Sequence, residues 1–210
     1  VGVVSDVMQA ANIQPRQIDS GAGQFAVSSD GALVYATGGV FPQDRWSLVS
    51  VDRTGRSEAL RVPSGMWQGP RVSPDGRRIA FGGPPNSTED WDVWTYDLQR
   101  GALASVPMQG SESIPVWTPD GSRIAVSSAP ARNRRGTLAV IDPDGRSPAE
   151  PLARTAIGYP GSWTPDGREV AFTNSETGVL APARSIWLAS RDGKAEPRQI
   201  LAGAVEPDFS

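Results

Sequence analysis

The sequence predicts an all-β fold, a β-propeller of four-stranded antiparallel blades, and three observations carry this prediction. A turn segment of the same pattern recurs four times, with its aspartates 45, 45 and 46 residues apart at Asp30, Asp75, Asp120 and Asp166. The chain contains 23 glycines and 19 prolines, a frequency of turn residues that disfavours long helices. No segment shows a convincing helical period, whereas repeats of about 45 residues with four short strands are typical of propeller blades.

The first two strands of each repeat flank the recurring turn. The four matching segments are residues 27–35, 72–81, 117–126 and 163–172. The first strand ends at the apolar residue before Ser or Thr, and the Pro-Asp-Gly turn follows. Proline presets φ, aspartate bonds back to the next amides, and glycine accepts positive φ. The second strands are expected at residues 78–81, 123–126 and 169–172; the first repeat has Ser29 where the others have proline.

The third strands alternate apolar and polar residues, which is the pattern of a half-buried strand. They are expected at residues 46–51, 92–98, 137–141 and 185–189. A second glycine turn follows each of them, and a short fourth strand ends near Leu60, Val106, Leu152 and Ile200.

One incomplete propeller domain over residues 1–210 is therefore expected. Its four complete blades are predicted at residues 23–62, 67–107, 112–153 and 158–202, with residues 1–22 and 203–210 as parts of neighbouring blades. These flanking strands do not complete a blade, so the chain is expected to be an excerpt of a longer protein and to self-associate through open blade edges.

Composition excludes several functions. The chain has no histidine and no cysteine, which removes Ser-His-Asp and Cys-His catalysis, thiolate metal sites and disulfides. We expect no catalytic residue, no metal site and no cofactor. A net charge of −3 does not favour a nucleic-acid partner, and no run of 18 apolar residues suits membrane insertion.

The turn motif in residues 72–81 and the Asp92–Leu98 strand resemble the blades of TolB-like, WD-repeat-like bacterial propellers, and the resemblance extends from about Gly23 to Ser210. It implies a six-bladed ring and a periplasmic or extracytoplasmic location. Similar propellers occur in TolB itself, in prolyl-oligopeptidase-type peptidases and in bacterial Ser/Thr kinases. The N-terminal residues 3–7 and 23–28 resemble the kinase-associated group most.

The candidate ligand-binding residues lie on the loops around the predicted channel mouth. Crossing segments between blades supply Trp67, Gln68, Glu112, Ser113 and Tyr159, among which Gln68, Ser113 and Tyr159 occupy equivalent repeat positions. A neighbouring loop supplies Arg132, Arg134 and Arg135, whose guanidinium groups suit an anion; they could equally be solvated or pair with Glu89 and Asp90. A mixed polar and aromatic rim suits a protein or peptide partner.

Two groups of conspicuous residues have structural interpretations. The repeated turn aspartates are explained by turn formation alone. Trp94, Trp117, Trp163 and Trp187, joined by Trp46, fall at inward-facing positions and are expected in the core, whereas Trp67 and Trp91 do not share these positions.

The leading hypothesis is a non-catalytic scaffold or sensor module that binds a protein, peptide or envelope ligand through its loop face. The alternative is the substrate-gating propeller of a prolyl-oligopeptidase-type serine peptidase whose catalytic domain lies outside this chain.

Overall fold

A computed structural model describes residues 25–27, 31, 33–36, 47–83, 92–106, 114–128, 136–155, 158–175, 184–205 and 207–209. These residues form sixteen strands and no helix. The strands pair in four separate four-stranded antiparallel sheets, each with its strands in chain order. The all-β prediction and the four-stranded blades are therefore confirmed, while a six-bladed ring stays a prediction.

We name the sheets blades A to D in chain order. Blade A contains β1 (Phe25–Val27), β2 (Leu33–Ala36), β3 (Leu48–Val51) and β4 (Ser57–Ala59). Blade B contains β5 (Gln68–Val72), β6 (Arg78–Gly83), β7 (Asp92–Asp97) and β8 (Ala102–Val106). Blade C contains β9 (Val116–Trp117), β10 (Ile124–Ser128), β11 (Gly136–Ile141) and β12 (Glu150–Thr155). Blade D contains β13 (Gly158–Trp163), β14 (Glu169–Ser175), β15 (Arg184–Ser190) and β16 (Arg198–Ala202).

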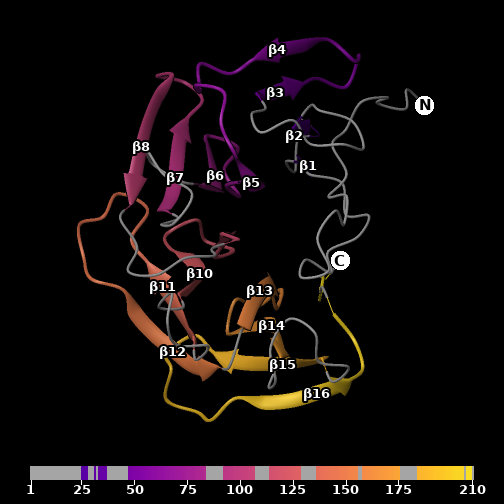
Figure 1. Ribbon diagram of the computed structural model, residues 1–210, viewed down its shortest axis with the longest axis vertical. Coiled ribbons are helices and arrows are strands. Elements are labelled where there is room, and N and C mark those ends of the chain that lie inside the picture. Colours follow the sequence, from indigo (N-terminus) through magenta and orange to yellow (C-terminus); the bar gives the residue numbers. More distant parts are fainter. Residues whose placement is uncertain are drawn as a thin grey trace.

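The blades follow one another around an arc (Figure 1). The first strand of each blade lies toward the centre of the arc, and the fourth strands β4, β8, β12 and β16 lie at its outside. The first strands of neighbouring blades contact each other, as β1 does with β5 and β9 with β13.

Most of the core lies between neighbouring blades, and a smaller cluster of Ala171, Ile186 and Leu188 lies within blade D. One cluster joins Val34 and Leu48 of blade A to Ile79 and Phe81 of blade B. A second spans blades B and C, and a third brings Leu138 and other residues of blade C against blade D. Each fully buried side chain of this size contributes about 1.5–3 kcal/mol, so stacking supplies the burial that a lone sheet lacks.

The tryptophans largely follow the prediction. Trp117 and Trp163 are buried, and Trp94 and Trp187 are partly buried and pack against the inter-blade clusters. Trp46 and Trp91 lie outside the described residues.

The outermost part of blade D is uncovered. Every residue of β16 is exposed. Large apolar side chains on and after this strand are exposed as well: Ile200, Leu201, Val205 and Phe209. Beyond β16, the Phe209 amide donates a hydrogen bond to the Ser162 hydroxyl of β13 over 2.9 Å, so residues 207–209 lie against the innermost strand of blade D.

Candidate binding face

The blades present two different ends, which we call the turn face and the crossing face. The turn face carries the Pro-Asp-Gly turns and the turns between the third and fourth strands. Two ion pairs join these turn types across blades, Arg191 with Asp120 and Arg78 with Asp144. The crossing face lies at the other ends of the strands, where the chain passes from one blade to the next and β5 and β13 begin.

Gln68 and Tyr159 occupy matching places on the crossing face. Gln68 is the first residue of β5 and pairs with Gly82, while Tyr159 is the second residue of β13 and pairs with Thr173. Both side chains are half-buried. The register shifts between Gln68 and Arg71 in β5 and between Pro160 and Ser162 in β13, and bulges of this kind re-aim side chains at sheet edges. The structure therefore brings two of the sequence-predicted residues to equivalent positions.

Trp67 lies in the core, which differs from the expectation of a side chain on the rim. Only 6% of it is exposed. Its ring packs edge-on against Phe81 and Trp94, with centroids 5.2 and 5.6 Å away, and its indole nitrogen donates to the Pro63 carbonyl over 2.8 Å. Because the Trp67 ring packs against two aromatic side chains and its nitrogen is hydrogen-bonded, it anchors the crossing segment and is not exposed to a ligand. Sequence periodicity did not place Trp67 in the core because it precedes the strand.

The remaining candidates cannot be placed. Glu112, Ser113, Arg132, Arg134 and Arg135 lie outside the described residues, as do Glu89 and Asp90. Their role in binding stays a prediction from loop position and chemistry.

The turn aspartates build the turn face. Asp75, Asp120 and Asp166 each accept a hydrogen bond from the Ser or Thr hydroxyl two residues earlier, over 2.6 Å. Each also accepts one from the amide two residues later. These contacts are the turn-forming role that the sequence predicts.

The same contacts explain the low pKa values of these carboxyl groups. The Ser73 hydroxyl lowers the pKa of Asp75, and the Thr164 hydroxyl lowers that of Asp166. At Asp120, burial raises the pKa, but bonds from Thr118, Ser122 and Arg191 outweigh burial and hold the pKa well below its usual range. All three are therefore charged near neutral pH.

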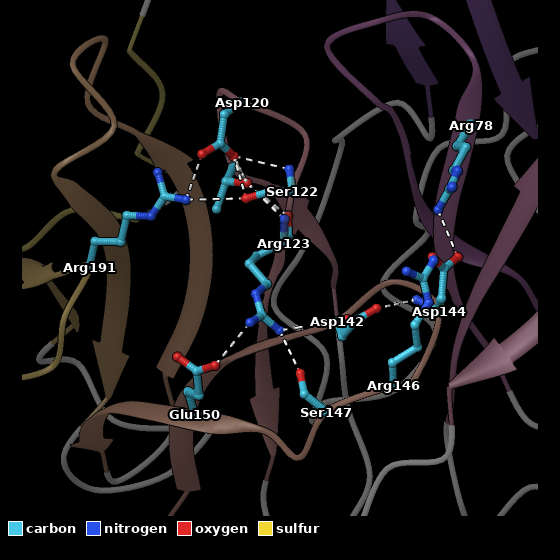
Figure 2. A network of polar contacts seen from close by, with 11 residues as sticks. Arg78, Asp120, Ser122, Arg123, Asp142, Asp144, Arg146, Ser147, Glu150 and Arg191 are labelled. Carbon is cyan, nitrogen blue, oxygen red and sulfur yellow. Dashed lines mark hydrogen bonds and ion pairs between the residues drawn. The ribbon is translucent and has the colours of Figure 1, made fainter.

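Arginines connect the blades across the turn face (Figure 2). Arg191 of blade D reaches Asp120 of blade C over 2.6 Å and Ser122 over 3.2 Å. Arg78 of blade B reaches Asp144 of blade C over 2.9 Å. These two ion pairs therefore help to hold blade C against its neighbours.

Arg123, in contrast, contacts residues of its own blade. Its guanidinium lies 2.7 Å from the Ser147 hydroxyl, 3.1 Å from Glu150 and 3.9 Å from Asp142, while Arg146 pairs with Asp144 (Figure 2). Sequence reasoning missed this network. The sequence signal for it was the charged residue at the start of the second strand in blades B, C and D, together with the aspartates in the later turns.

The described ranges contain neither a cluster of metal-ligating residues nor a membrane-spanning helix. No group of three or more His, Cys, Asp or Glu residues that could hold a metal ion occurs there. The same part of the chain contains no helix long and apolar enough to cross a membrane.

Comparison with known proteins supports the fold. The sequence matches no protein-family model and has no significant match among curated proteins. Among solved structures, TolB from Acinetobacter baumannii is 20% identical with a TM-score of 0.69, over 88% of this chain and 44% of that one. A putative TolB from Agrobacterium tumefaciens is 18% identical with a TM-score of 0.72, over 87% of this chain and 68% of that one.

The propeller domain of a peptidase is similar as well. The β-propeller domain of the Trilobed protease from Pyrococcus furiosus is 13% identical with a TM-score of 0.57, over 85% of this chain and 56% of that one. The chain therefore has a TolB-like β-propeller fold, and it spans less than half the length of the Acinetobacter TolB it resembles.

Proposed function

We propose that the chain is a non-catalytic β-propeller module that binds a protein or peptide through its crossing face. The extracytoplasmic location implied by the sequence resemblance is part of this proposal. The ligand-binding residues include Gln68 and Tyr159, with Glu112, Ser113, Arg132, Arg134 and Arg135 on the neighbouring loops.

The matched placement of Gln68 and Tyr159 carries the proposal. An amide and a phenol, both half-buried, begin the inner strands of two blades, where propeller loops are free to vary. Tyrosine combines a large apolar ring with a hydroxyl and is enriched where proteins meet. On the turn face, by contrast, Arg78 and Arg191 already pair with aspartates of a neighbouring blade.

A second candidate function is the gating propeller of a serine peptidase. The likeness to the propeller domain of the Trilobed protease favours it. With no histidine in this chain, the general base would come from another domain. A hydrolase domain with a Gly-x-Ser-x-Gly elbow in the same polypeptide would favour this function over the binding module.

A peptide-display selection against the immobilised protein tests the binding proposal. Peptides that bind the wild type are then measured against Gln68→Ala and Tyr159→Ala variants. We expect at least about tenfold weaker binding, the loss of one interface anchor of about 1.4 kcal/mol. The control is Arg168→Ala, a change on the turn face where the side chain is 85% exposed. Equal affinity of all four proteins would refute the crossing face as the binding surface.

Self-association through open blade edges also belongs to the proposal. Ile200 and Leu201 are exposed on β16, the outermost strand of blade D, and leave apolar surface on this open edge. Light scattering after size exclusion should show species larger than 22.2 kDa, and Leu201→Lys should reduce them. A monomer at all concentrations contradicts this expectation.

A further inference from the structure

The outer strand of blade D exposes apolar side chains at positions that blade C buries. Leu201 of blade D has the same pairing as Ala153 of blade C, and Ile200 and Leu152 are the bulged residues before them. Ala153 and Leu152 are buried in the cluster that blades C and D share. Leu201, by contrast, is 53% exposed, and Ile200 is exposed as well. Blade D therefore lacks the cover that the following blade gives to blade C.

Phe209 occupies the place of the buried tryptophan in the first strand of a blade. It follows Trp163 by 46 residues, as Trp163 follows Trp117, and Ser or Thr is the next residue each time. Trp117 and Trp163 are buried, and each pairs with a residue of the second strand of its own blade. Phe209 is 39% exposed, and no strand in the described part of the chain pairs with residues 207–209. This segment is therefore placed as a first strand with an open edge.

Residues 207–209 already lie against blade D. The chain returns from β16 toward the centre of the arc (Figure 1), and the Phe209 amide donates to the Ser162 hydroxyl of β13 over 2.9 Å. Gly161 allows this approach, because a Cβ atom there would meet the Pro207 carbonyl oxygen. The first strands β5, β9 and β13 contact one another in the same order at the earlier junctions.

Blade D also presents one half of a junction core. Ala171, Ile186 and Leu188 pack together with Ala204. Ala171 alternates along β14 with two residues that pack against blade C, so it projects from the opposite face of the sheet. Residues with the same pairing in blade C form its side of the junction with blade D: Ala125, Leu138 and Val140.

We propose that the side of blade D away from blade C is a docking surface for a three-stranded antiparallel β-sheet, which takes residues 207–209 as its innermost strand and forms a further blade with them. Continuity with the two earlier junctions carries the proposal, because they bury the residues that are exposed here. This surface is separate from the crossing face, so the proposal goes beyond the binding function proposed above and does not depend on it.

The pairing in blades B, C and D predicts the chemistry of the docking strand. The residue opposite the last position of the first strand is β-branched each time: Ile79, Ile124 and Val170. Alanine follows, and a fully buried Phe or Val comes next: Phe81, Val126 and Phe172. Alternate residues of a strand share a face, so the first and third of these pack on the preceding blade. We expect the same order opposite Phe209, with the β-branched and the large apolar residue against blade D.

The test extends the full chain. Because Phe209-Ser210 matches Trp163-Thr164, a copy of residues 165–202 is appended directly after Ser210. The copy carries Ile200→Thr and Leu201→Lys, which keep its own outer strand polar. We expect a single cooperative transition, a melting temperature at least about 5 °C above that of the unextended chain, and hydrogen exchange of the Phe209 amide slowed at least about tenfold.

The matched control is the same extension with Val170→Lys and Phe172→Lys in the copy. These changes keep length and register but remove the two side chains that pack on blade D, so neither the melting temperature nor the exchange rate should improve. An extended chain that aggregates, or that melts and exchanges as its lysine control does, overturns the proposal.

Leu201→Lys in blade D itself reports whether the appended strands cover this surface. In dilute solution the substitution should leave the melting temperature of the unextended chain nearly unchanged and should lower that of the extended chain, because only there is Leu201 covered. Equal effects in both chains overturn the proposal. If a second copy of the chain is the true occupant, light scattering shows the same oligomer with and without the extension, which overturns it as well.

Discussion

The Trp117 indole nitrogen lies 3.0 Å from the main-chain oxygen of Arg71, and this hydrogen bond ties the inner strand of blade C to that of blade B. The equivalent residue one blade later behaves differently. Trp163 is as deeply buried, but its indole nitrogen has no partner. The guanidinium of Arg191 lies 6.0 Å from the Trp163 ring centroid instead. Trp117 therefore bonds across a blade junction, whereas the contact of Trp163 with Arg191 lies within blade D.

This difference predicts unequal effects of the same substitution. Trp117→Phe removes the inter-blade hydrogen bond, and Trp163→Phe removes an unsatisfied donor, while both lose similar ring volume. We expect Trp117→Phe to be the more destabilising by about 1 kcal/mol. Urea unfolding of both variants measures the difference. Equal midpoints would mean that the bond to Arg71 adds nothing to the stacking of blades B and C.

The ion pair between Asp120 and Arg191 predicts a small, salt-sensitive coupling across blades C and D. Both side chains are partly exposed, at 49% and 37%, so the coupling in a double-mutant cycle should be about 0.2–1 kcal/mol. Asp120→Asn and Arg191→Met provide the cycle. The coupling should shrink between about 0.01 M and about 1 M salt.

Asp120→Asn alone should cost more than this coupling. Asp120 also accepts bonds from the Thr118 hydroxyl and the Ser122 amide, which hold its own turn. Asp166→Asn is the matched variant, because Asp166 occupies the same turn position without the bond to Arg191. A coupling that is independent of salt would contradict a solvent-exposed pair.

The turn carboxylates predict a loss of stability in acid. The pKa values of Asp75, Asp120 and Asp166 are lowered in the folded chain from 3.8. Their contribution is complete above the unfolded pKa and is lost as pH falls through the folded values, because the unfolded chain then binds more protons. Urea midpoints should fall steadily from about pH 5 to about pH 2. Asp166→Asn should flatten this dependence, and a flat wild-type profile would contradict it.

We expect the substitution Gly193→Ala to destabilise the contact between blades C and D strongly. Its φ is +64°, and a Cβ atom there would lie 2.5 Å from the Pro151 carbonyl oxygen. Gly55 is the matched control, since its φ is +86° with nothing within 4 Å of the same atom.

Both alanine substitutions should lower the free energy of unfolding by about 1–2 kcal/mol, because alanine disfavours the left-handed backbone conformation. Gly193→Ala should lose clearly more, because a backbone oxygen cannot turn away as a side chain can. Thermal unfolding compares the two, and equal losses would show that the turn shifts freely against Pro151.

Sequence reasoning found the parts of the fold that repeat and missed those that do not. The recurring Asp-Gly turns and the alternating third strands predicted four-stranded antiparallel sheets, because each pattern is set by local backbone chemistry. The burial of Trp67 could not be found this way, since it depends on Gly83 lying across the sheet beneath the ring. Gln68 and Tyr159 were found by repeat alignment, because they occupy the same place at the start of two inner strands.

The charged position at the start of the second strand in blades B, C and D has a consequence for how this protein could have diversified. Arg78 bonds forward to the next blade, Arg123 bonds within its own blade, and Glu169 pairs with Arg198 of its own blade. The blades therefore share one backbone plan but differ in the ion pairs made at this position. A duplicated copy of blade B inserted after blade C would present its arginine to Asp192 of blade D, which occupies the place of Asp144 and has a neighbouring cation, Lys194, as Asp144 has Arg146. A rearrangement of the repeats would therefore keep the backbone plan and change which ion pairs cross the junctions.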